Sequence, residues 1–203
     1  MRKKKVLHTL SILALTLTFT ACSTVKKDEQ KTDTTTNSQV STIEHAMGKT
    51  DVKGTPKRVV VLTNEGTEAL LALGVKPVGA AKSWTGKPWY KHIEKDMEGV
   101  QSLGDESQIN IEAVAALNPD LIIGNKMRHE KIYDQLSKIA PTVYSNTLRG
   151  EWKPNFEFYA KVLNKEAEGK EIIKKFDDRA ASIAKLAGAK LKTEVSIVRF
   201  MPG

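Results

Sequence analysis

A chain of 203 residues with a single cysteine has no internal disulfide framework, so its folded part depends on an ordinary packed core. Its formal net charge is +8, but the first 21 residues hold four basic and no acidic residues, so the remainder carries only +4. Because the lysines are spread among glutamates and aspartates instead of clustering with aromatic residues, the composition argues against nucleic-acid binding.

The N-terminus has the pattern of a secretory signal. Basic residues 2–5 precede an apolar run over 6–19. This run is shorter than the ~20 residues that a membrane-spanning helix needs, which favours cleavage over the alternative, a permanent anchor helix. We therefore predict a signal peptide over 1–21.

The single cysteine, Cys22, follows this run and has a small residue before it. Residues 18–22 (TFTAC) resemble the bacterial lipobox, with Phe19 where leucine is usual. The resemblance implies a lipid on Cys22, which would hold the protein at the extracytoplasmic face of the cell membrane. Residues 22–43 are polar, threonine-rich and poor in large apolar side chains. They predict a flexible tether, because such a segment buries too little surface to fold.

Beyond the tether, short apolar runs alternate with segments of helical periodicity. The predicted strands are 58–62, 77–80, 120–124 and 141–144, and the predicted helices are 67–73, 110–117 and about 129–139. Gly74 ends the first helix and Asn110 caps the second. Alternation of strand and helix is typical of a parallel sheet covered by helices on both faces, so we predict an α/β lobe over 44–165.

The last third of the chain has a different pattern. Apolar residues recur at helical spacing over 166–187, and at 1.5 Å per residue such a helix spans roughly 30 Å, about one domain width. Residues 193–200 then have the pattern of a strand, and a strand needs neighbours. We therefore expect 189–203 to be the incomplete start of a second, similar lobe, most of which this sequence does not contain.

Six short stretches together resemble one family of solute-binding proteins. They are 45–48 (HAMG), 56–62 (PKRVVVL), 71–79 (LALGVKPVG), 110–112 (NIE), 117–123 (LNPDLII) and 139–143 (IAPTV). In this order they resemble the iron-siderophore and cobalamin class of solute-binding lipoproteins of ABC importers, in particular the Gram-positive proteins for hydroxamate and citrate-based siderophores. The resemblance implies two α/β lobes joined by one bridging helix, here 166–188, with the ligand between the lobes. It further implies a monomer that captures a ferric siderophore and delivers it to a permease dimer.

A ferric siderophore of this kind is rich in oxygen and often anionic, and its chelator already fills the coordination sphere of the iron. The protein then needs no metal ligand or cofactor of its own, only cationic donors and aromatic walls. Open α/β sheets bind ligands beyond the carboxyl ends of their strands. The candidates there are Lys82 and Trp84 after the second strand, Arg128 after the third and Arg149 after the fourth. The resemblance implies one more candidate, Arg199, which lies in the last predicted strand.

The resemblance supports Lys82, Arg128 and Arg199 as ligand-binding cations. For Arg149 a surface role is the alternative, and for Arg199 the alternative is a charge on an edge strand. Glu112 lies in the first turn of a predicted helix, where the helix dipole favours a carboxylate. The resemblance implies that Glu112 also docks the lobe onto arginines of the permease.

Other chemistries have little support in the sequence. His45, His92 and His129 lack the spacing of metal ligands, so we expect surface or capping roles for them and no metal site. The sequence contains no phosphate-binding glycine loop, dinucleotide fingerprint or Gly-x-Ser-x-Gly motif, so none of these motifs supports an enzymatic function. The alternatives are a binding protein of the same type for haem, cobalamin or a metal ion, an exported flavodoxin-like enzyme, and a surface scaffold.

Overall fold

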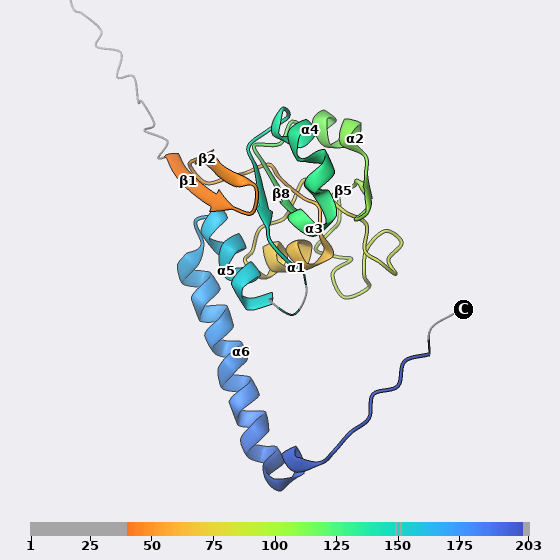
Figure 1. Cartoon of the computed structure of the whole chain (residues 1–203), viewed down its shortest axis with the longest axis vertical. Helices are drawn as coiled ribbons and strands as arrows, with labels where there is room; N and C mark the ends of the chain where they lie inside the picture. Colours follow the sequence, from red (N-terminus) through yellow and green to blue (C-terminus); the bar gives the residue numbers. More distant parts are fainter. Residues whose placement is uncertain (1–39, 149, 151, 201–203) are drawn as a thin grey trace, which may run out of the picture. The chain divides into compact units, whose positions relative to one another are not determined.

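A computed structural model of the chain describes residues 40–148, 150 and 152–200. Cys22, the expected signal peptide and most of the expected tether lie outside these residues, as does Arg149. Five parallel strands form the central sheet in the order β5–β4–β3–β8–β9. Figure 1 labels β5 and β8 of this sheet. They are β3 (Val59–Val61), β4 (Gly79–Ala80), β5 (Gln101–Ser102), β8 (Leu121–Asn125) and β9 (Thr142–Ser145).

The central strands are buried on both faces, as expected for a parallel sheet. Because side chains alternate along a strand, Val59 and Val61 pack in one core cluster, whereas Val60 and Leu62 pack in another. The first cluster lies under α1 (Asn64–Ala72), α5 (Trp152–Val162) and the first turns of α6 (Glu166–Ala187). The second lies under α2 (Ile111–Ala116) and α4 (Tyr133–Ser137). The predicted α/β lobe with helices on both faces is therefore confirmed.

Two short hairpins complete the lobe, and neither was predicted. The first pairs β1 (Val40–His45) with β2 (Gly48–Lys53) and is tied to the edge strand β9, where Thr50 Oγ1 donates to the Thr142 carbonyl at 2.9 Å. The second pairs β6 (Gly104–Asp105) with β7 (Gln108–Ile109) and lies just before α2. The α5 helix, which covers one face of the sheet, was also not predicted.

Besides shifts of one to three residues at the ends of strands and helices, three expected segments differ from the structure. The tether cannot extend to residue 43, because β1 begins at Val40. The helix expected over 129–139 is broken into α3 (Lys126–His129), a 3-10 turn η1 (Glu130–Ile132) and α4. Residues 193–200 are exposed and form no strand, since no strand among the described residues pairs with them. Their assignment to a second lobe stays a prediction.

The long helix of the last third is confirmed. It runs over Glu166–Ala187, and a second 3-10 turn, η2 (Gly188–Lys192), follows it. Its start packs on the lobe: Gly169 is buried, and a Cβ there would meet Ala160 Cβ at 2.6 Å. Farther along, Phe176, Ile183 and Leu186 are exposed. No helix among the described residues is long and apolar enough to cross a membrane.

Candidate binding site

The carboxyl ends of the strands surround a hollow of about 390 Å³. The chain runs from β3 outward through β4 to β5 and then returns to place β8 on the other side of β3. The strand order therefore switches between β3 and β8, which is where open α/β sheets bind ligands. We call this the strand-end hollow, and it is lined by Asn64, Lys82, Trp84, Asp105, Glu106, Ser107 and Arg128.

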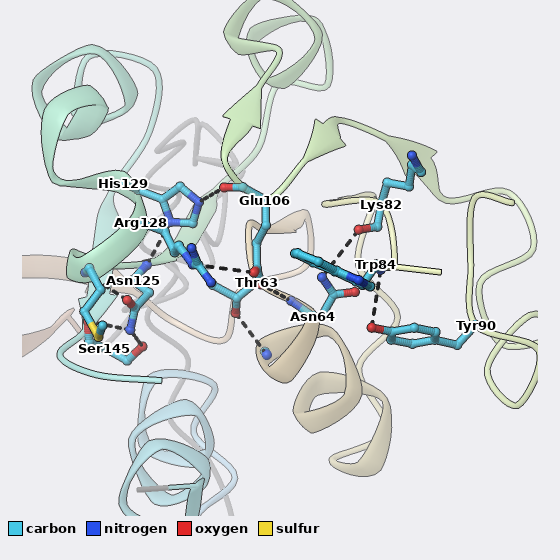
Figure 2. Close-up of polar contacts among 12 residues, drawn as sticks. Thr63, Asn64, Lys82, Trp84, Tyr90, Glu106, Asn125, Arg128, His129 and Ser145 are labelled. Atoms are coloured by element: carbon cyan, nitrogen blue, oxygen red, sulfur yellow. Dashed lines mark hydrogen bonds and ion pairs between the residues drawn. The ribbon is translucent and has the colours of Figure 1, made fainter. Parts of the chain in front are cut away.

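Three of the five predicted ligand-binding residues meet in this hollow. Lys82 and Trp84 follow β4, and Arg128 lies in α3, directly after β8 (Figure 2). Arg199 lies in the exposed segment after η2 and does not line the hollow. The structure therefore brings together the cations predicted after β4 and after β8, the two strands that flank β3, while their contact with a ligand stays a prediction.

Each cation of the hollow faces a carboxylate that sequence reasoning missed. Lys82 Nζ lies 3.2 Å from Asp105 Oδ1, and both side chains are well exposed. Arg128 Nε lies 3.8 Å from Glu106 Oε2. Both carboxylates belong to the β6–β7 hairpin and its turn. The hollow thus contains two cations and two carboxylates.

Glu106 is fixed at both its side chain and its backbone. Its Oε1 accepts a hydrogen bond from the Asn64 backbone N–H at 2.7 Å, at the start of α1. Its carbonyl oxygen lies 2.9 Å from His129 Nε2. His129 Nδ1 lies 3.1 Å from the Asn125 backbone N–H and accepts from it, so Nε2 carries the proton and donates to Glu106. Figure 2 shows Glu106 between Arg128 and Asn64.

His129 is buried, although a surface or capping role was expected for it. It is only 2% exposed, and burial lowers its pKa below the ordinary histidine value. The neutral ring is the form that can accept from Asn125 and donate to Glu106 at the same time. A surface role for His129 is wrong, because its two hydrogen bonds link the β6–β7 turn to the end of β8.

Asn125 sets the direction of the α3 segment that carries Arg128. Its side chain is fully buried, and Oδ1 accepts from the Met127 backbone N–H at 2.9 Å. Its Nδ2 donates to the Ser145 carbonyl at 3.2 Å and to Ser145 Oγ at 2.9 Å. The side chain thus joins the ends of β8 and β9 and caps α3, which places Arg128 at the rim of the hollow.

Trp84 offers an open aromatic surface beside the cations. Its side chain is 78% exposed, yet its backbone N–H donates to the Tyr90 hydroxyl at 3.3 Å. The same loop is anchored by Trp89, which is packed in the core under α1. An exposed indole on a held backbone is suited to stacking on a ligand, because the loop is already ordered and an aromatic side chain has few rotatable bonds.

A second carboxylate network lies close to the hollow at the start of α1. Glu65 Oε1 accepts from Asn155 Nδ2 at 2.7 Å and from the Tyr159 hydroxyl at 3.2 Å. Burial raises the pKa of Glu65, and the nearby Glu106 carboxylate adds to the rise, although the two hydrogen bonds act against it. Burial also raises the pKa of Tyr159, so its hydroxyl remains a donor. This network ties α1 to α5 below the hollow.

Glu112 lies apart from the strand-end hollow. It is exposed in the first turn of α2, and Asn110 caps this helix by accepting from the Ala113 backbone N–H at 2.9 Å. The expected position of Glu112 in the first turn of a helix is confirmed. Its docking onto a permease stays a prediction. The described residues contain no group of three or more histidine, cysteine or acidic side chains that could hold a metal ion.

Comparison with known proteins gives concordant matches. Residues 59–203 match the family described as periplasmic binding protein. The chain is 48% identical to the probable siderophore-binding lipoprotein YfiY of Bacillus subtilis over 202 residues, which are 99% of this chain and 62% of that protein. It is 35% identical to the Fe(3+)-citrate-binding protein YfmC of the same organism over 170 residues, 82% of this chain and 54% of that protein.

A solved structure is similar in both sequence and fold. Staphylococcus aureus SirA complexed with staphyloferrin B matches at 47% identity with a TM-score of 0.71, over 75% of this chain and 52% of that chain. YfiY and YfmC carry the names of binding proteins, and the SirA structure holds staphyloferrin B. The chain spans roughly half to three fifths of the length of the relatives that it matches.

Proposed function

This chain belongs to the periplasmic binding protein family, and from that premise we propose that it captures a ferric siderophore of the hydroxamate or citrate-based kind for an ABC importer. The observation that carries the proposal is the strand-end hollow, where Lys82, Arg128 and Trp84 converge at the switch in strand order. Charged donors recognise carboxylate and hydroxamate oxygens, and an aromatic face covers the rest of the chelate. The names of YfiY and YfmC support the same class of ligand.

The iron itself needs no protein ligand in this proposal. The chelator fills its coordination sphere, so the protein recognises the outside of the complex and works without a resident cofactor. Charge-assisted hydrogen bonds from lysine and arginine are about twice as strong as neutral ones, which suits an anionic cargo. The family resemblance adds a second lobe that closes over the ligand and Arg199 as a further contact. Arg149, which follows the fourth predicted strand, is a further candidate, with a surface role as its alternative.

Ligand titration tests this proposal. It uses the longest natural form of the protein that contains this chain. We expect a ferric siderophore to quench tryptophan fluorescence at micromolar concentration or below, and we expect Trp84→Phe to remove most of the quenching because Trp84 lines the hollow. Trp152→Phe is the matched control, since Trp152 lies outside the hollow. Tight binding of haem or cobalamin, with no response to any ferric siderophore, would contradict the proposal.

Delivery completes the proposed function. In this scheme the closed, monomeric complex docks on the permease dimer through Glu112, which is exposed at a capped helix start. The name of YhfQ, a putative ABC transporter substrate-binding lipoprotein of Bacillus subtilis, supports delivery to an ABC transporter.

A lipid on Cys22 would keep the protein near the permease, where docking becomes nearly intramolecular. We expect Cys22→Ala to move most of the protein from the membrane fraction into the medium, because the single acceptor for the lipid is lost. Immunoblots of the two fractions measure this, and Ser23→Ala is the matched control. Retention of the Cys22→Ala protein in the membrane fraction would show that another segment anchors the chain.

A further inference from the structure

The strand-end hollow contains a carboxylate, Glu106, whose position is fixed by hydrogen bonds. The Glu106 side chain is 15% exposed, its Oε1 is held by the Asn64 N–H at 2.7 Å, and its backbone is held by His129. The bond to Asn64 lies at the N-terminus of α1, where a negative charge is stabilised. Glu106 is therefore a fixed part of the site.

The second oxygen of Glu106 has room for a further partner. Oε2 faces Arg128 Nε at 3.8 Å, which is beyond the 2.7–3.2 Å of an ordinary N–H···O hydrogen bond. Arg128 has other N–H groups for a ligand, and Oε2 retains acceptor capacity. A chelate bound at Arg128 would thus meet a cation and a carboxylate within a few ångströms of each other.

The second ion pair of the hollow has a different character. The side chains of Lys82 and Asp105 are 40% and 63% exposed, and exposed pairs of this kind exchange readily with water and ligands. Lys82 points away from Glu106 in Figure 2. The Lys82–Asp105 ion pair can therefore break when an anion binds to Lys82, whereas Glu106 stays beside Arg128.

We propose that Glu106 determines specificity by accepting a protonated amine of the siderophore while Arg128 and Lys82 bind its anionic oxygens. This inference rests on the proposed function and names the ligand class more closely: a ferric chelate that carries a free ammonium group in addition to its iron-binding oxygens. A chelate with carboxylates alone places like charges side by side at Glu106, which disfavours it.

The test uses Glu106→Gln, which keeps an oxygen acceptor for the Asn64 N–H and removes the charge. The probes are ferrioxamine B, which has one free primary amine, its N-acetylated form, and ferric citrate, which has no amine. We expect the unchanged protein to bind ferrioxamine B at least about tenfold more tightly than the acetylated form, because a hydrogen bond to a charged group is lost on acetylation. Glu106→Gln should erase that preference and strengthen ferric citrate binding by about tenfold.

Asp105→Asn is the matched control, since it removes a neighbouring charge from the same hollow; it should keep the amine preference. Equal affinity for the two ferrioxamines in the unchanged protein, binding of ferric citrate alone, or a preference that survives in Glu106→Gln would each overturn the inference. Failure of the proposed function has a different signature, because then the unchanged protein binds no ferric chelate at all.

Discussion

We expect a protein carrying Lys82→Glu and Arg128→Glu to bind its ferric siderophore at least about 100-fold more weakly than the unchanged protein. Both cations line the strand-end hollow, and each reversal adds a carboxylate beside the one already present, Asp105 or Glu106. The altered hollow contains four carboxylates and repels an anionic chelate. Tryptophan fluorescence or calorimetric titration measures the loss.

The matched control is Lys76→Glu with Lys131→Glu. These two lysines are exposed and lie outside the hollow, and the control produces the same change in net charge. We expect its affinity to stay within about threefold of the unchanged protein, because exposed charges far from the ligand are screened by salt. Thermal unfolding checks that all variants fold. If neither Lys82→Glu nor Arg128→Glu weakened binding, the ligand would have to bind elsewhere.

We expect Asn125→Ala to lower the free energy of unfolding by about 3 kcal/mol. Its side chain is fully buried and makes hydrogen bonds to the Met127 N–H, the Ser145 carbonyl and Ser145 Oγ. Alanine removes all of these bonds and leaves the Ser145 carbonyl without this donor in the interior. Denaturant unfolding monitored by circular dichroism measures the change.

Asn110→Ala is the control for this prediction. Asn110 also caps a helix with its side chain, accepting from the Ala113 N–H, but it is exposed to water. We expect a loss of about 1 kcal/mol there, because water replaces the lost bond. Asn125→Ala should also weaken ligand binding, since Arg128 loses its fixed position, whereas Asn110→Ala should leave binding unchanged. Equal losses of stability in the two variants would mean that burial of Asn125 contributes nothing.

The predicted sheet and the long helix follow from local patterns. Continuous apolar runs such as 120–124 indicate a buried parallel strand, and sustained helical periodicity indicates α6, because burial imposes these periods on the residues that face the core. The two-residue strand β5 and the hairpin β6–β7 carry no such pattern, since only a few residues of each pair. The hairpin β1–β2 was missed because polar residues dominate it, and only Ile43 and Val52 enter the core.

The broken helix after β8 has a physical reason in its packing. A continuous helix over 129–139 would satisfy the periodicity, but the His129 ring is turned inward to reach both Asn125 and Glu106. The Tyr144 hydroxyl also donates to the His129 carbonyl at 3.1 Å, so that carbonyl has a partner outside the helix. These tertiary contacts end α3 at His129 and allow α4 to begin only at Tyr133.

The sequence by itself determined the α/β lobe, the long helix and the cations at the ends of two strands. These features depend on neighbouring residues and on the rule that parallel strands end at one edge of a sheet. Only the tertiary structure decided which carboxylates face those cations. Glu106 and Asn64 are 42 residues apart, and Lys82 and Asp105 are 23 apart, so they meet only because the β6–β7 hairpin folds back over the strand ends. Local periodicity carries no information about such long-range contacts, and the charge balance of the hollow depends on them.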